Sequence, residues 1–227
     1  MTRERNDVQA WSVASISAAA KRARRSLLSS LARARTTSPF GGVALTFDDG
    51  PHPEYTPRIL DLLAEQNSRA TFFVVGERAV RHPDVVRRIV LEGHALGTHS
   101  MSHPNMREVS PRRAIAEVRA GRTAVEQIVG TSIPLFRPPM GRLTTATAAL
   151  VHNRTWSTWL WNIDSYDWKT NTAPALILDA CGWAGNGDVV LLHDNLENTV
   201  EGTRLLTERI SAAGVPMRSL SHARVLA

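Results

Sequence analysis

The sequence predicts an α/β protein built on a mostly parallel sheet, and three observations lead to this fold class. From residue 40 onward, short runs typical of buried strands alternate with longer runs of helical periodicity, the order expected of βα units. Roughly seven such units follow one another, which favours a sheet closed into a barrel. The 227 residues are enough for one sizeable domain with its own core, and no apolar stretch has the length of a membrane-spanning helix.

The first half of the domain contains three strand–helix pairs. Apolar runs bounded by turn residues indicate the strands, apolar periodicity indicates the helices, and Gly93 ends the second helix. Ser110 supplies an N-cap, Pro111 a first-turn proline and Gly130 a C-terminal stop for the third helix. In chain order the elements are Val43–Phe47, helix Pro57–Glu65, Ala70–Val75, helix Pro83–Leu91, Ala95–Thr98 and a helix from Pro111 to about Val129.

The second half repeats the same alternation with shorter elements. Four further strands and three further helices are expected on the same grounds. The strands are Ile133–Phe136, Thr158–Ile163, Val189–His193 and Val215–Leu220, and the helices are Thr144–His152, Ala173–Cys181 and Thr199–Ala213. Cys181 is the only cysteine, which excludes an intrachain disulfide framework and a cysteine-rich zinc module.

Residues 1–39 differ in composition from the rest, being rich in Arg, Ala and Ser with no proline or glycine before Pro39. We therefore expect two parts, this N-terminal segment and a domain over residues 40–227. Residues 1–40 hold eight basic and two acidic residues, which account for the whole net charge of +6 and leave 19 of each sign elsewhere. The domain has no net field to attract a polyanion, so nucleic acid is not an expected partner.

The N-terminal segment allows two interpretations. As a helix it would place an apolar stripe on one face, interrupted by Arg24, and such a basic amphipathic helix could rest weakly on an anionic membrane surface. The stripe consists of Val13, Ile16, Ala20, Leu27 and Leu31. A solvated, poorly ordered extension is the favoured interpretation. Residues 8–20 contain Gln9 and three serines, so a secretory signal is poorly supported.

Five predicted strands end in polar residues, and in a parallel α/β fold such ends meet at one edge of the sheet. One such coincidence means little, but five at the same edge predict a functional site. The residues are Asp48 and Asp49, His99 and His103, Arg137, Asp164 and Asp167, and His193.

These residue types point to a catalytic metal. Adjacent carboxylates such as Asp48 and Asp49 repel each other unless a cation or proton lies between them, and two histidines four residues apart can face one ion. Two imidazoles and one carboxylate leave coordination positions open, as at catalytic sites, where the metal acts as a Lewis acid. Asp48 can then be the base and His193 the acid, with Arg137 orienting Asp48 and an acidic residue near Asp167 holding His193. The other histidines are expected on the surface or in the core, namely His52, His82, His94, His152 and His222.

The polar strand ends match the motifs of a known family. The sequence resembles the polysaccharide deacetylases, carbohydrate esterase family four, which share the NodB homology domain. The matching stretches are Thr46-Phe-Asp-Asp-Gly-Pro51, His99-Ser-Met-Ser-His103, Arg137-Pro-Pro-Met-Gly141, Asp164-Ser-Tyr-Asp-Trp168 and Leu191-Leu-His-Asp194. The resemblance implies a distorted (β/α) barrel of seven or eight mostly parallel strands and hydrolysis of acetyl groups on a sugar polymer.

The resemblance also implies roles for single residues. Asp49, His99 and His103 would bind one divalent metal ion, usually Zn²⁺ and sometimes Co²⁺ or another transition metal. Asp48 would be the base, held by Arg137, and His193 the acid, tuned by Asp167. Trp168 and Leu191 would line an apolar pocket for the acetyl methyl, and the backbone N–H of Met140, a position often occupied by Tyr in the family, would stabilise an oxyanion.

Several functions remain open on the sequence. The leading hypothesis is removal of N-acetyl groups from N-acetylglucosamine in chitooligosaccharide or peptidoglycan. The alternatives are an O-acetyl esterase on xylan or a similar polymer, a non-haem iron oxygenase, and a non-enzymatic binder of nucleic acid or membrane through the N-terminal segment. The sequence favours a cytoplasmic or membrane-peripheral location, whereas the resemblance favours the cell envelope or secretion, and oligomeric state is left open.

Overall fold

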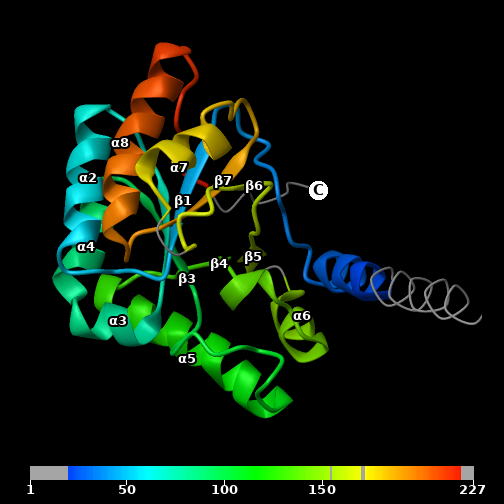
Figure 1. The fold of residues 1–227 in the computed structure, drawn as a ribbon. Helices are drawn as coiled ribbons and strands as arrows, with labels where there is room; N and C mark the ends of the chain where they lie inside the picture. Colours follow the sequence, from blue (N-terminus) through cyan, green and yellow to red (C-terminus); the bar gives the residue numbers. More distant parts are fainter. Residues whose placement is uncertain (1–19, 154, 170–171, 221–227) are drawn as a thin grey trace, which may run out of the picture.

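All strands of the sheet are parallel, as expected. The computed structural model describes residues 20–153, 155–169 and 172–220. Within them the seven strands lie in the order β5-β4-β3-β2-β1-β7-β6 (Figure 1). Their bounds are β1 Ala44–Asp48, β2 Thr71–Val74, β3 Ala95–Thr98, β4 Leu135–Phe136, β5 Ser157–Thr158, β6 Ile163–Asp164 and β7 Val189–His193.

A short connection between the two edge strands shows that the sheet is curled. β5 and β6 lie at opposite edges, and a flat sheet of this many strands would hold its edges about 29 Å apart. Only residues 159–162 join them, and a chain from Thr158 to Ile163 reaches at most about 18 Å. The edges must therefore approach each other, which confirms the predicted distorted barrel as a curled, incompletely closed one.

Helices cover the outside of this curled sheet. Figure 1 shows α2, α4 and α8 on one flank, and α5 beside α3, α4 and α6. The bounds are α2 Tyr55–Glu65, α3 Gly76–Arg81, α4 Pro83–Leu91, α5 Pro111–Val129, α6 Thr145–Val151, α7 Pro174–Cys181 and α8 Glu197–Ala212, with a 3₁₀ turn at Pro139–Gly141. No helix in the described ranges is long and apolar enough to cross a membrane.

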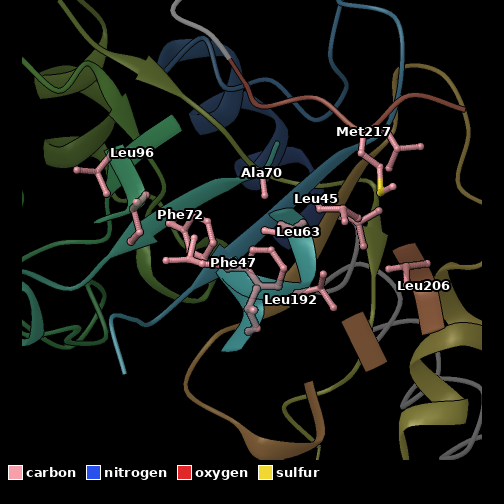
Figure 2. Packing of buried hydrophobic residues seen from close by; sticks show 14 of the residues in the cluster. Leu45, Phe47, Leu63, Ala70, Phe72, Leu96, Leu192, Leu206 and Met217 are labelled. Atoms are coloured by element: carbon pink, nitrogen blue, oxygen red, sulfur yellow. The ribbon is translucent and has the colours of Figure 1, made fainter. Parts of the chain in front are cut away.

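The strands alternate between the helix-covered face and the barrel interior. Leu45 and Phe47 of β1 point outward into the main core, where Phe47 stacks on Phe72 at 5.0 Å between ring centroids (Figure 2). Thr46 and Asp48, one residue out of step, point inward. In β7, the outward residues Val190 and Leu192 belong to the same core, while Leu191 and His193 face the interior. This alternation delivers the polar side chains to the inside of the barrel.

Most predicted elements are present, and two of the predicted strands differ from the structure, each for its own reason. The predicted strand Thr158–Ile163 is split into β5 and β6, because it crosses from one edge of the sheet to the other. The predicted strand Val215–Leu220 forms only a single bridge, Val43 to Met217, because β1 is already flanked by β2 and β7 and offers no free edge. Helix α3 and the 3₁₀ turn were not predicted from the sequence.

Part of the N-terminal segment packs on the domain. Residues 20–31 are helical, and Leu28 and Ala32 are buried in a cluster that includes Met106 and Phe136. The expected apolar face is wrong at Leu27, which is 69% exposed. Val13 and Ile16 lie outside the described residues. Arg35 also pairs with Trp159 beside β5, so packing continues across the boundary expected at residue 40.

Replacing Leu28 with Ala tests whether this helix belongs to the folded domain. Leu28 is 5% exposed, so its truncation should lower the free energy of unfolding by about 2–4 kcal/mol. The matched control Leu27→Ala removes an exposed side chain of the same kind and should change it by less than about 0.5 kcal/mol. Urea unfolding monitored by tryptophan fluorescence measures both. Equal effects of the two substitutions would contradict docking of the helix through Leu28.

Candidate active site

The strand ends that carry polar residues enclose one pocket of about 440 Å³. It is lined by Asp48, Asp49, His99, His103, Met140, Arg142, Trp161, Asp164, Trp168, Leu191 and His193. Arg137 and Asp167 are buried and contact Asp48 and His193 from behind. The structure therefore brings together every site residue expected from the sequence. Arg142 and Trp161 line the pocket as well and were not expected there.

Three side chains form a group that fits a metal ion. Oδ1 of Asp49 lies 3.2 Å from Nε2 of His103 and 3.6 Å from Nε2 of His99, and one ligand atom from each residue lies within 4.8 Å of the others. Asp49 Oδ1 is buried and accepts no hydrogen bond from any described residue. A buried carboxylate oxygen without a donor is costly unless a cation meets it, so this donor set fits a divalent ion.

The imidazole of His99 is prepared as a neutral ligand. Its Nδ1–H donates to the carbonyl oxygen of Arg137 at 2.8 Å, which leaves the Nε2 lone pair directed at Asp49. Burial lowers the pKa of His99 to about 3 against the opposing charge of Asp49. A metal-binding histidine must be deprotonated at one ring nitrogen, and here the fold keeps it so.

Helix α5 holds the loop that carries both histidines, an arrangement not recognised in the sequence. The carboxylate of Glu117 accepts hydrogen bonds from Ser102 N at 2.9 Å and Ser102 Oγ at 3.0 Å. Gly121, one turn further on, lies so close to the Ser100 carbonyl that a Cβ there would collide with it. The sequence signal was an acidic residue between Ala114 and Val118 on the buried face of a long helix, where a solvated glutamate is not expected.

Asp48 is held by a fully buried arginine. Nη1 of Arg137 donates to Asp48 Oδ1 at 2.7 Å and to Thr46 Oγ1 at 2.8 Å, and its guanidinium lies 4.3 Å from the ring centre of Phe73. Burial raises the pKa of Asp48, and the charge of Arg137 opposes the rise. Arg137 contacts only one carboxylate oxygen, so Asp48 offers a second oxygen in a setting that strengthens it as a proton acceptor.

Asp167 holds His193 in its protonated form, in contrast to the neutral His99. Nδ1 of His193 lies 2.8 Å from Asp167 Oδ1, and Asp167 Oδ2 accepts from His193 N at 2.7 Å and from Thr199 Oγ1 at 2.8 Å. Burial disfavours the charged ring, but the hydrogen bond and charge of Asp167, with Asp48 and Asp49, raise the pKa of His193 to about 9. Near neutral pH the ring is therefore a proton donor. Thr199 had not been expected as a partner.

Backbone strain gathers around the pocket. Five residues other than glycine have positive φ angles there, namely Asp49 (73°), Ser100 (68°), His103 (56°), Met140 (55°) and Tyr166 (56°). Such conformations are retained where the surrounding structure imposes them, commonly at functional sites. Met140 and Trp168 lie half exposed at the rim, and Leu191 is buried in the wall. The predicted oxyanion role of Met140 N–H and the methyl-pocket role of Trp168 and Leu191 stay predictions.

Comparisons with known proteins agree with this site. A family model described as polysaccharide deacetylase matches residues 35–156. A peptidoglycan-N-acetylglucosamine deacetylase of Bacillus cereus is 34% identical over 161 residues, which cover 71% of this chain and 58% of that protein. A chitooligosaccharide deacetylase of Azorhizobium caulinodans is 33% identical over 162 residues, which cover 71% of this chain and 77% of that protein.

Solved structures give the same result. A family 4 carbohydrate esterase from Streptomyces lividans, in complex with acetate, superimposes with a TM-score of 0.73 at 33% identity and covers 81% of this chain and 95% of that one. The chain belongs to the polysaccharide deacetylase family, which confirms the class expected from its motifs.

Titration of His193 tests the electrostatics of the pocket without any substrate. In the metal-free protein its ring should remain protonated up to a pH of about 9. Asp167→Asn removes the main stabilising charge, so the pKa should fall and the ring should lose its proton at lower pH. The shift of the ring Cε1–H resonance with pH, followed by NMR, measures this.

The matched control Asp188→Asn changes a carboxylate immediately before the first residue of β7, whereas His193 is the last residue of that strand. It should leave the pKa of His193 unchanged. Titration of His193 near 6.5 in the unsubstituted protein would contradict the account of this pair.

Proposed function

We propose that this chain is a metal-dependent hydrolase that removes N-acetyl groups from N-acetylglucosamine units of chitooligosaccharide or peptidoglycan. One observation carries the proposal: the carboxylate of Asp48 and the imidazole of His193 line the same pocket as one aspartate and two histidines whose ligand atoms could hold a metal ion. Amide hydrolysis needs this pairing, because water must lose a proton while the leaving amine gains one. The names of the Bacillus cereus and Azorhizobium caulinodans relatives support the substrate class.

The metal would be held by Asp49, His99 and His103. When bound there, a divalent ion such as Zn²⁺ supplies Lewis acidity, which polarises a carbonyl oxygen and makes water easier to deprotonate. The identity of the ion belongs to the proposal, since nitrogen and oxygen ligands of this kind also suit Co²⁺ and other transition metals.

Asp48 acts as the general base. Its oxygen that does not contact Arg137 takes a proton from water, and the remaining hydroxyl adds to the acetyl carbon. Arg137 keeps this carboxylate in place and compensates its charge inside the barrel. The backbone N–H of Met140 is expected to stabilise the developing oxyanion, a contribution of about 3 kcal/mol in comparable sites.

His193 acts as the general acid. As the bond between the acetyl carbon and the sugar nitrogen breaks, His193 donates its Nε2 proton to that nitrogen, which leaves as the free amine, and acetate is the second product. Asp167 compensates the ring's positive charge before the transfer and fixes its orientation.

Acetate release from chitooligosaccharide tests the proposal directly. The purified protein loaded with Zn²⁺ should release acetate, and a chelator should abolish the release. Asp48→Asn removes the base without changing the size of the side chain, and should lower kcat by a factor of about 10² or more.

Asp61→Asn is the matched control, because it changes an exposed aspartate on α2 that pairs with Arg88, and it should retain activity. Unchanged activity of Asp48→Asn, or full activity after removal of the metal, would refute the proposed roles.

O-acetyl ester hydrolysis is the second candidate, favoured by the structural likeness to a carbohydrate esterase bound to acetate. A leaving alcohol needs less protonation than a leaving amine. His193→Ala should therefore reduce kcat/KM for an N-acetylated oligosaccharide at least about tenfold more than for acetylated xylan. Similar losses on both substrates, with xylan the better substrate of the unsubstituted protein, would favour the esterase.

A further inference from the structure

A second hollow, of about 400 Å³, lies beside the catalytic pocket. It is lined by Pro51, His52, Pro53, Arg78, Arg81, His82 and Asn195. Two arginines and two histidines line it, and no carboxylate does. Three acidic residues lie near it. Glu77 pairs with the exposed Arg81 at 3.4 Å, Glu54 lies near His52, and Asp194, which precedes Asn195, accepts a hydrogen bond from the Thr56 hydroxyl that itself accepts from His52 N.

The two hollows share one wall. Nη1 of Arg78 donates to the backbone oxygen of Asp49 at 2.6 Å, while Asp49 itself lines the catalytic pocket. On the other side of the wall, His193 lines the catalytic pocket and Asn195, two residues further along, lines the second hollow. A glycan with one sugar in the catalytic pocket can therefore place part of a neighbouring sugar over the second hollow.

The side chains of the second hollow present hydrogen-bond donors. Nδ1 of His52 accepts from the backbone N–H groups of Glu54 and Tyr55, both at 3.2 Å, so the ring proton sits on Nε2. Burial and the charges of Arg78 and His82 lower the pKa of His52 against the effect of Glu54, which keeps it a neutral donor.

Asn195 adds an amide group to the lining. Its Oδ1 is buried and accepts no hydrogen bond from the described residues.

We infer that this second hollow is a carboxylate-binding subsite for an acidic substituent on the sugar next to the one being deacetylated. The inference rests on the proposed function and narrows it to acidic glycans. Guanidinium groups match a carboxylate in charge and shape. Arg78 and Arg81 each use one nitrogen for the contacts to Asp49 O and Glu77, which leaves further N–H groups for such a ligand.

Two sources could supply this carboxylate, and three substrates of equal sugar number distinguish them. They are chitotetraose, a tetrasaccharide of alternating N-acetylglucosamine and N-acetylmuramic acid, and the same tetrasaccharide carrying stem peptides. The lactyl carboxylate of muramic acid is free only in the second substrate, because the stem peptide is joined to it through an amide bond. A lactyl source therefore predicts a higher kcat/KM than that of chitotetraose for the second substrate alone. A peptide carboxylate predicts this only for the third.

Arg81→Gln tests the subsite, because Arg81 lies outside the catalytic pocket. It should lower kcat/KM for the preferred acidic substrate about five- to tenfold and that for chitotetraose less than about twofold. The matched control Arg209→Gln removes one charge near the far end of α8 and should change neither. Activity on chitotetraose also shows that the variant is folded.

Binding of the deacetylated acidic product provides a second readout that needs no catalysis. Arg81→Gln should raise its Kd about five- to tenfold, and added salt should reduce the difference. Equal kcat/KM on all three substrates, together with an unchanged Kd, overturns the subsite and leaves the proposed function standing. No acetate from any substrate, with a Kd that still depends on Arg81, overturns the proposed function and supports the subsite.

Discussion

The buried ion pair between Arg137 and Asp48 is the interaction on which both the barrel and its chemistry depend. Arg137 is fully buried at the end of β4, and besides β1 it donates to the carbonyl oxygens of Trp159 and Leu160. Those two residues belong to the short connection between the edge strands. A guanidinium in such a place needs a charge partner and several acceptors. One side chain therefore ties together the centre of the sheet, its closing segment and the proposed base.

Around this pair the fold sets two acid–base groups apart by their surroundings. Asp48 is buried against the guanidinium of Arg137, while His193 is buried against the carboxylate of Asp167, which accepts three hydrogen bonds. Burial disfavours the charged form of both groups. It raises the pKa of Asp48 against the charge of Arg137, whereas at His193 the charge and hydrogen bond of Asp167 overcome it and raise the pKa to about 9. Solvent plays little part in setting these states, because the supporting residues Arg137 and Asp167 are both buried.

Much of this arrangement was readable from the sequence because it is local. Helix α5 was predicted with its bounds, since Ser110 caps it and Gly130, at a φ of 70°, ends it. Residues at strand ends were predicted to meet, since parallel strands share an edge. Strand pairing and side-chain orientation could not be predicted in the same way. The predicted strand 158–163 is split by the curvature of the sheet, and Leu28 is buried where Leu27 was expected. Glu117 holds the histidine loop through Ser102, fifteen residues away in the chain. Each depends on contacts distant in the chain.

The strict in–out alternation of β1 couples correct folding to chemistry. Phe47 and Asp48 are neighbours in the chain, yet Phe47 belongs to the hydrophobic core under the helices and Asp48 lines the catalytic pocket. Slippage of β1 by a single residue relative to β7 would exchange them. The ring of Phe47 would then fill the catalytic pocket, and the carboxylate of Asp48 would face the hydrophobic core, where no cation pairs with it. A misaligned barrel would thus be unstable and inert at once, so any molecule that folds stably also has its base in place.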